Sequence, residues 1–200
     1  MRSGKAPEKC HDSVMLTGHA TVMTSNRSII AALLLLPCLS AIADCPRVAG
    51  EEDDRRANAG CLIIQDDRVL LLTHRWGGKL GVPGGTLEEG ELAQCTAWRE
   101  TAEEVGLAVT VGKRLAVMSN GFHLYRCYPR QPLRSHAPLP VPGSALTEVT
   151  AIGWYPLSSL RKESWRFHYQ FDQFIAVADE AMRSEKDAAQ AGANGGLQAK

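Results

Sequence analysis

The sequence lacks an excess of charge of either sign. Its 200 residues carry 22 Lys and Arg against 22 Asp and Glu, so the formal net charge at pH 7 is zero. Proteins that hold a nucleic-acid polymer depend on basic residues that neutralise its phosphates. We therefore expect a small-molecule partner and no nucleic-acid polymer.

A long hydrophobic run is also missing. The most apolar stretch, residues 29–39, has about eleven residues, whereas a bilayer span needs about twenty. We therefore expect no stable membrane anchor. No internal repeat is visible, and with 44% hydrophobic and 22% charged residues the chain has the composition of one globular domain with tails.

The apolar stretch has the surroundings of an export signal. Arg27 precedes it and the small residues Ala41 and Ala43 follow it, which is the order of a secretory signal peptide. The long region before Arg27 favours a translation start at Met15 or Met23. We predict a signal-peptide-like segment over residues 1–43 and a periplasmic or secreted protein. The alternative is a buried helix in a cytoplasmic protein.

Export would decide the state of the cysteines. Cleavage after Ala43 leaves Cys45, Cys61, Cys95 and Cys127. In an oxidising compartment these four can pair in three ways, between which the sequence does not choose. In the cytosol they would be buried thiols.

Three parts follow the signal-peptide-like segment. Residues 44–58 are predicted to be a charged linker, residues 59–183 a folded α/β domain, and residues 184–200 a disordered tail, because the tail is polar and rich in Ala and Gly without periodicity. Two apolar runs at residues 61–64 and 69–73 flank a polar turn, which predicts a β-hairpin. Further strands are predicted at residues 109–118, 122–128 and 149–154, with a proline-rich loop at residues 129–142.

Two helices are predicted in the domain. Residues 91–105 contain good helix formers without Gly or Pro, and Gly106 stands where a C-terminal cap belongs. Residues 167–182 place Phe171, Phe174 and Ala178 on one helical face.

Three carboxylates crowd one face of the first helix. Glu100, Glu103 and Glu104 stand at i, i+3 and i+4, so they repel one another, and the last two lie in the last turn, where the helix dipole disfavours anions. A hard divalent cation bound over the three carboxylates would offset their mutual repulsion. The alternative is a solvated acidic face.

The residues before this helix continue the pattern. Gly85 is followed by five residues, Glu91, seven residues, and then Arg99-Glu100-Thr101-Ala102-Glu103-Glu104-Val105-Gly106-Leu107. This order resembles the Nudix box. Thr101 is the one departure, since the family usually places an aliphatic residue there; its methyl group can still pack inward.

The resemblance implies a fold and a metal site. The fold would be an α/β/α sandwich around a mixed β-sheet, spanning residues 59–183. The cofactor would be Mg²⁺ or Mn²⁺, and the family pattern assigns its ligands to Glu100, Glu103 and Glu104, with the carbonyl of Gly84 or Gly85 as a further ligand. Glu91 and Arg99 would form the ion pair that orients the loop and the first metal carboxylate.

The resemblance also implies an activity, hydrolysis of a nucleoside diphosphate linked to another moiety by attack of water on phosphorus. Glu103 or Glu104 would act as the base. Glu148 is a further candidate for the base, although a surface position in a loop is the simpler interpretation of that residue.

Substrate-binding residues are harder to predict. Arg75, Trp76 and Gly84 are candidates because they lie in or beside the glycine-rich loop. Phe122, His123 and Tyr125 could also stack on a ring, although aromatic residues in strands are more often part of the core.

The chain is thus expected to be an exported, bacterial-type Nudix hydrolase. A module with the same fold that binds its ligand without cleaving it is the alternative. Such modules tend to lose glutamates of the box, and this chain keeps all of them. Cys95 lies away from the acidic face of its helix and is expected to face the sheet, as a core thiol or bonded to a strand cysteine.

Overall fold

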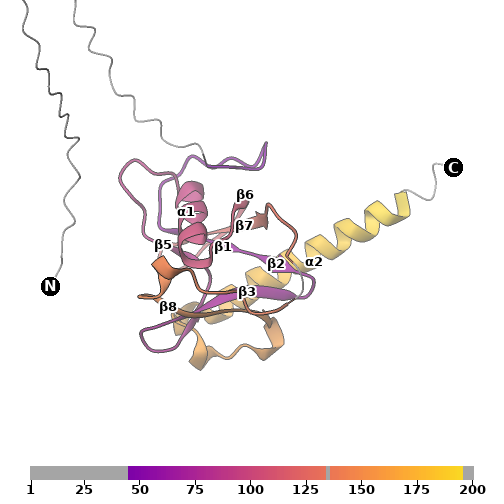
Figure 1. Cartoon of the computed structure of the whole chain (residues 1–200). Coiled ribbons are helices and arrows are strands. Elements are labelled where there is room, and N and C mark those ends of the chain that lie inside the picture. The colour runs from indigo at the N-terminus through magenta and orange to yellow at the C-terminus, as the bar shows by residue number, and fades with distance from the viewer. Residues whose placement is uncertain (1–44, 134–135, 196–200) are drawn as a thin grey trace, which may run out of the picture. The chain divides into compact units, whose positions relative to one another are not determined.

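The computed structural model describes residues 45–133 and 136–195. The predicted signal-peptide-like segment therefore lies outside the described residues. The helices and strands, shown in Figure 1, are β1 (Ala59–Leu62), β2 (Ile64–Gln65), β3 (Arg68–His74), β4 (Leu80–Gly81), β5 (Gly84–Gly85), α1 (Ala93–Val105), β6 (Val109–Val117), β7 (His123–Pro129), β8 (Val149–Pro156) and α2 (Phe171–Gly195).

The strands form two sheets that share one stretch of chain. The first sheet has the order β5-β1-β7-β6, in which β1 and β7 are parallel and the other pairs are antiparallel. In the second sheet, β3 pairs with β8 along one edge and with β2 and β4 along the other. Only Ile63 separates β1 from β2, so one run of chain passes from the first sheet to the second.

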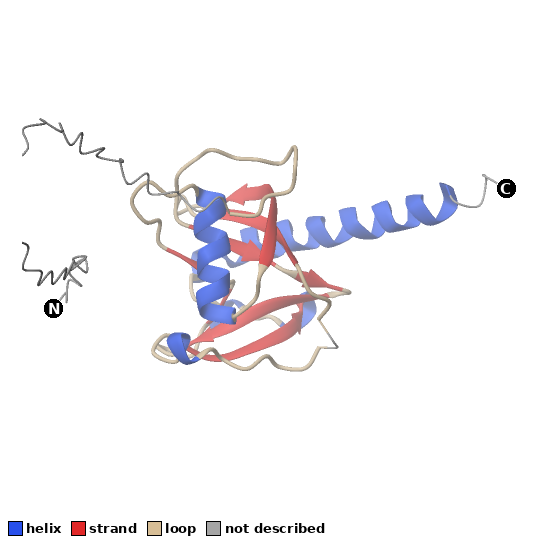
Figure 2. Ribbon diagram, turned by 45° about the horizontal axis from the view of Figure 1, so that its top comes forward, coloured by secondary structure: helices blue, strands red, loops and turns tan. Residues whose placement is uncertain are grey.

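Both faces of the strands are buried. Along the run from β1 to β2, Cys61 and Ile63 belong to the core cluster that contains residues of α1, whereas Leu62 and Ile64 belong to the cluster that contains residues of α2. Alternate side chains of a strand point to opposite faces, so a sheet covered on both sides needs an uninterrupted apolar run. The structure confirms the predicted α/β/α arrangement with a mixed sheet (Figure 2).

Helix α1 matches its prediction closely. It begins at Ala93 rather than at residue 91, because Leu92 still has extended backbone. Two residues of the helix, Ala93 and Ala97, are fully buried. Gly106 ends the helix with a φ of 73° and donates its N–H to the carbonyl of Ala102. This left-handed conformation explains why a glycine stands there.

The predicted hairpin is only partly correct. Ile64 and Gln65 pair with Val69 and Arg68, as expected. Cys61 and Leu62, however, belong to β1, which pairs with the distant strand β7. A fully apolar run does not indicate which of the two sheets it will join, because its side chains would be buried in either sheet.

The predicted disordered tail is wrong over most of its length. Helix α2 starts at Phe171, after a short 3₁₀ helix at His168–Gln170, and continues to Gly195. Its last part, residues 184–195, contains four Ala and one each of Glu, Lys and Gln, which favour a helix even without an apolar face. None of the helices in the described residues is long and apolar enough to cross a membrane.

The segment predicted as a linker is bound to the domain. Cys45 forms a disulfide with Cys95 of α1, with a Cα–Cα distance of 5.2 Å. The neighbouring Gln94 is fully buried; its Nε2 donates to the carbonyls of Glu51 and Gly112, and its Oε1 accepts the N–H of Asp53 at 2.8 Å. Residues 45–53 therefore pack against the N-terminal half of the helix.

A second disulfide joins two strands. Cys61 of β1 is bonded to Cys127 of β7, with a Cα–Cα distance of 5.4 Å. Of the three possible pairings, the structure thus selects Cys45–Cys95 and Cys61–Cys127. The partner of Cys95 lies in the segment before β1 and not in a strand, because that segment folds back over α1.

Removal of either disulfide should destabilise the domain. For Cys61→Ala/Cys127→Ala and for Cys45→Ala/Cys95→Ala we expect the free energy of unfolding to fall by about 2–4 kcal/mol, since each bond closes a long loop in the unfolded chain. Urea titration, monitored by tryptophan fluorescence, measures this free energy of unfolding. A reducing agent should lower the unfolding midpoint of the unaltered protein, and an unchanged midpoint would contradict the pairing.

Candidate active site

An acidic cleft opens between α1, β5 and the start of β8. Its volume is about 490 Å³, and it is lined by the carboxylates of Glu100, Glu103, Glu104 and Glu148, by Gly84–Thr86 and by Arg166. Five residues predicted for the site, the three glutamates of α1 together with Gly84 and Gly85, are thereby brought together. The cleft is rich in acidic side chains, with Arg166 as its basic residue.

Arg99 ties α1 to the loop that carries the glycines. Its Nε lies 3.0 Å from Glu91, its Nη1 lies 2.9 Å from Glu100 and 3.3 Å from Glu103, and its Nη2 donates to the carbonyl of Thr86 at 2.9 Å. Burial would lower the pKa of Arg99, but its bonds to the surrounding carboxylates outweigh burial and raise it. The guanidinium therefore stays charged and holds the loop against the helix.

Glu91 is the main partner of that guanidinium. Its carboxylate also accepts the N–H of Glu88 at 3.1 Å and the hydroxyl of Thr96 at 2.9 Å. Burial alone would raise the pKa of Glu91, but the hydrogen bonds from Arg99, Glu88 and Thr96 together lower it. The ion pair predicted from the sequence is thus present, and neither of its members lines the acidic cleft.

Gly85 allows the loop to approach α1. A Cβ atom at this position would lie 2.5 Å from the carboxylate of Glu100 and would force that carboxylate to move. Burial raises the pKa of Glu100, as do the charges of Glu103 and Glu148, while Arg99 opposes them. The absence of a side chain at Gly85 thus gives the Glu100 carboxylate its place beside the loop.

Glu104 is the most buried carboxylate of the cleft. It is 7% exposed, and its Oε2 accepts the N–H of Gly84 at 2.8 Å. Burial, together with the nearby charges of Glu100 and Glu148, raises its pKa to about 8. The site therefore holds a carboxylate whose charge is unfavourable without a neutralising cation.

The donor atoms of the cleft suit a hard divalent cation, because carboxylates of α1 and backbone of the glycine loop meet in it. Within residues 45–133 and 136–195, no three His, Cys, Asp or Glu side chains are yet grouped closely enough to hold an ion. Glu103 instead contacts Arg99, and its side chain is 59% exposed. The residues present fit a cation by their chemistry and by the cleft they share.

Two residues of the cleft were undervalued or missed in the sequence. Glu148 is exposed, as expected for a loop, but the short 3₁₀ helix Gly143–Ala145 before it brings it to the cleft opposite α1. Arg166 was not predicted at all. It lies between Trp165 and Phe167, and no spacing or motif in the sequence connects it with the glutamates.

Arg166 is placed by a buried histidine. Its Nη1 lies 3.4 Å from Nδ1 and 3.3 Å from Nε2 of His74, which is 7% exposed. Burial, and then the charge of Arg166, lower the pKa of His74 to about 4. The imidazole is therefore neutral at pH 7 and can accept a hydrogen bond from the guanidinium.

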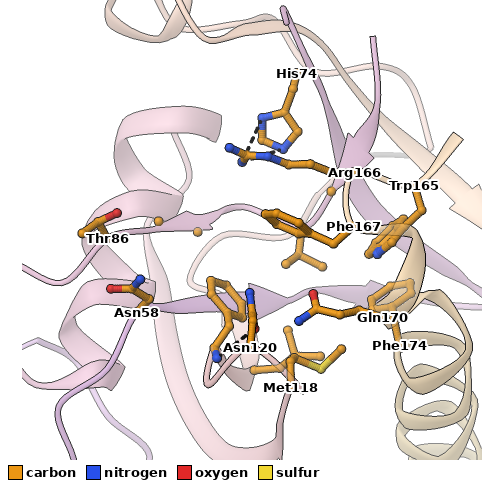
Figure 3. A pocket seen from close by; sticks show the side chains of 16 residues that line it. Asn58, His74, Thr86, Met118, Asn120, Trp165, Arg166, Phe167, Gln170 and Phe174 are labelled. Carbon is orange, nitrogen blue, oxygen red and sulfur yellow. Dashed lines mark hydrogen bonds between the residues drawn. The ribbon is translucent and has the colours of Figure 1, made fainter. Parts of the chain in front are cut away.

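A second pocket adjoins the cleft. This aromatic pocket has a volume of about 170 Å³ and shares Gly84–Thr86 and Arg166 with the acidic cleft. Its walls carry Phe122, Trp165 and Phe174, and the amide side chains of Asn58, Asn120 and Gln170 lie around it (Figure 3). An apolar space beside a charged one suits a ligand with a ring at one end and anionic groups at the other.

The remaining candidates are dispersed. Trp76 is 83% exposed, Arg75 donates to the carbonyl of Leu146, and neither lines the two pockets. His123 and Tyr125 are buried, which agrees with the core interpretation, whereas Phe122 lines the aromatic pocket. Thr101, the departure from the box, is fully buried, and its hydroxyl donates to the carbonyl of Ala97 at 2.7 Å.

Comparison with known proteins agrees with this arrangement. The family model described as NUDIX domain matches residues 54–174, which includes all the lining residues of the acidic cleft and of the aromatic pocket. Among curated proteins, none matches the sequence.

Solved structures provide further likenesses. An ADP-ribose pyrophosphatase from Streptococcus suis is 22% identical with a TM-score of 0.50, and the match covers 65% of this chain and 93% of that one. A NUDIX hydrolase from Nitrosomonas europaea is 21% identical with a TM-score of 0.50, and the match covers 64% and 73%. At this level of identity the likeness concerns the fold alone.

The buried Glu104 should make stability depend on pH. Its folded-state pKa of about 8 exceeds its ordinary value of 4.5, so the free energy of unfolding falls as pH rises between these values. Without metal, Glu104→Gln should therefore raise the melting temperature more at pH 9 than at pH 5. Differential scanning calorimetry measures this difference.

The exposed Glu180 provides the matched control, because Glu180→Gln changes the same group outside the cleft. That variant should melt with the pH dependence of the unaltered protein. An equal effect of both substitutions, or none for Glu104→Gln at pH 9, would show that Glu104 is not held in an unfavourable charged state.

Proposed function

The chain belongs to the Nudix family of hydrolases, and we propose that it cleaves the diphosphate linkage of a nucleoside diphosphate joined to another moiety. One observation carries the proposal. All the charged residues of the box are present, and three of its glutamates converge on a cleft that also contains Arg166. A cleft of this kind suits a phosphate-bearing substrate together with a cation.

The proposed cofactor is Mg²⁺ or Mn²⁺, with Glu100, Glu103 and Glu104 and the carbonyl of Gly85 as the residues that would hold it. When bound, such an ion neutralises phosphate oxygens and lowers the pKa of a bound water. The raised pKa values of Glu100 and Glu104 support a cationic partner, because both carboxylates gain from a positive charge nearby.

The residues of the chain have separate roles in the proposed reaction. Arg99 and Glu91 hold the glycine loop against α1, which orients Glu100 toward the cleft. Arg166 reaches the cleft from the segment before α2 and can pair with phosphate oxygens. The base that takes a proton from the attacking water is Glu103 or Glu104, and Glu148 joins these candidates because its carboxylate lines the same cleft.

Substitution of a box glutamate tests the activity. Glu103→Gln should lower kcat by at least about a hundredfold with little change in melting temperature, because it removes a carboxylate from the reacting centre. Release of phosphate-containing products would be measured with Mg²⁺ or Mn²⁺ on ADP-ribose, dinucleoside polyphosphates and sugar nucleotides. Glu180→Gln again serves as the control and should retain full activity.

The outcomes separate the alternatives. Retained turnover in Glu103→Gln would remove that residue from the reaction, and the same assay on Glu148→Gln would show whether the base lies on the opposite wall. Binding of these ligands without cleavage by the unaltered protein would instead identify a binding module. A melting shift with Mg²⁺ that vanishes in Glu100→Ala would support the cation site independently of turnover.

We also propose that the protein is exported, to the periplasm or the medium. The proposal rests on the order of basic, apolar and small residues before Ala43 and on the two disulfides, which form and persist in oxidising compartments. Expression of the full chain in a bacterium, followed by mass spectrometry of the periplasmic fraction, should recover a chain that begins at Asp44. Recovery of the complete chain with reduced cysteines from the cytosol would contradict export.

A further inference from the structure

Gln170 presents a buried amide without a partner. The residue is only 4% exposed, and its buried Nε2 donates no hydrogen bond to any described residue. Two other glutamines show the ordinary case. Gln94 uses both ends of its amide, and so does Gln173, which accepts the N–H of Ser119 and donates to the carbonyl of Val117.

An unpartnered buried amide is costly to the folded state, because its lost hydration is not replaced. Figure 3 shows that the end of the Gln170 side chain points into the aromatic pocket, toward Asn120 on the other side. A group that fills this pocket would therefore be the natural partner of the amide.

The walls of the pocket define the shape of that group. Trp165 stacks on Phe174, with ring centroids 4.2 Å apart and an angle of 23° between the planes, and both are at most 5% exposed. Phe122, Met118 and Leu124 belong to the same apolar lining. Flat apolar surfaces of this kind favour a planar ring.

The volume limits the size of the ring. About 170 Å³ is well below the roughly 300–1,000 Å³ of pockets that enclose a whole drug-sized ligand, so the pocket suits one ring system. The rest of the ligand must leave through the opening, where Gly84–Thr86 and Arg166 lead into the acidic cleft. A ring in the pocket would thus be connected to phosphates in the cleft.

A primary amide pairs best with a ring edge that offers a donor beside an acceptor. Nucleobases have such edges, and Gln is a common partner of the adjacent donor and acceptor of adenine. Proteins that bind an isolated base combine edge hydrogen bonds of this kind with apolar or aromatic walls.

We propose that Gln170 selects the substrate by hydrogen-bonding the edge of a nucleobase held in the aromatic pocket, while the diphosphate lies in the acidic cleft. This inference rests on the proposed function for the position of the diphosphate. It adds a specificity residue that lies outside the box, 66 residues after Glu104 in the chain.

The first experiment measures binding without turnover. Isothermal titration calorimetry would compare AMP and UMP with ribose 5-phosphate, which lacks a base, on the unaltered protein and on Gln170→Met. The unaltered protein should bind at least one of the nucleotides more tightly than ribose 5-phosphate, and Gln170→Met should reduce this preference about tenfold. Equal affinity of the unaltered protein for all three compounds would overturn the inference.

Gln65→Met is the matched control. Gln65 donates to the carbonyl of Leu133 and lines neither the aromatic pocket nor the acidic cleft, so the same chemical change there should leave the preference intact. The melting temperature of Gln170→Met should be unchanged or higher, because an unpartnered amide is replaced by an apolar side chain of similar size. A large fall in melting temperature with an unchanged preference would assign Gln170 a structural role instead.

The second experiment adds turnover. Gln170→Met should lower kcat/KM for ADP-ribose about tenfold and leave kcat/KM for ribose 5-diphosphate unchanged, since only the first substrate carries a base. An equal fall for both substrates would contradict selection by the base. If nothing is cleaved but the preference in binding depends on Gln170, the proposed function fails while the assignment of the pocket stands.

Discussion

The arrangement of the site depends on the guanidinium of Arg99. This single group contacts Glu91, Glu100 and Glu103 and the carbonyl of Thr86, so it connects the start of α1, its acidic face and the glycine loop. Because Gly85 has no side chain, the loop can lie directly against the carboxylate of Glu100. The close approach and the ion pair thus act on the same contact between the loop and the helix.

The rest of the fold keeps α1 in position for this contact. The segment of residues 45–53 packs against the N-terminal half of the helix, where Gln94 and the Cys45–Cys95 disulfide hold it. On the inner side, Ala93 and Ala97 pack into the core formed by β1 and β7, which the Cys61–Cys127 disulfide joins. A helix restrained from both sides keeps its acidic face at the cleft.

Much of this was accessible from the sequence because the signals are local. The spacing of Glu100, Glu103 and Glu104 places them on one helical face whatever surrounds the helix, and Gly106 ends the helix where a left-handed residue is needed. The strands expected at residues 109–118, 122–128 and 149–154 agree with β6, β7 and β8 within about two residues, a usual error at element ends. The tail was misjudged because helix formers without an apolar face give no periodic signal.

The sequence by itself therefore determined the acidic helix, the glycine loop and the family to which they belong. Only the tertiary structure decided what meets them. Arg166, Glu148 and Gln170 come from segments that follow α1 by many residues, and their positions depend on how β8 and α2 pack across the sheets. The pairing of the cysteines was decided in the same way. Local spacing reports on neighbours along a helix or strand, whereas contacts between distant segments arise only when the whole core is buried.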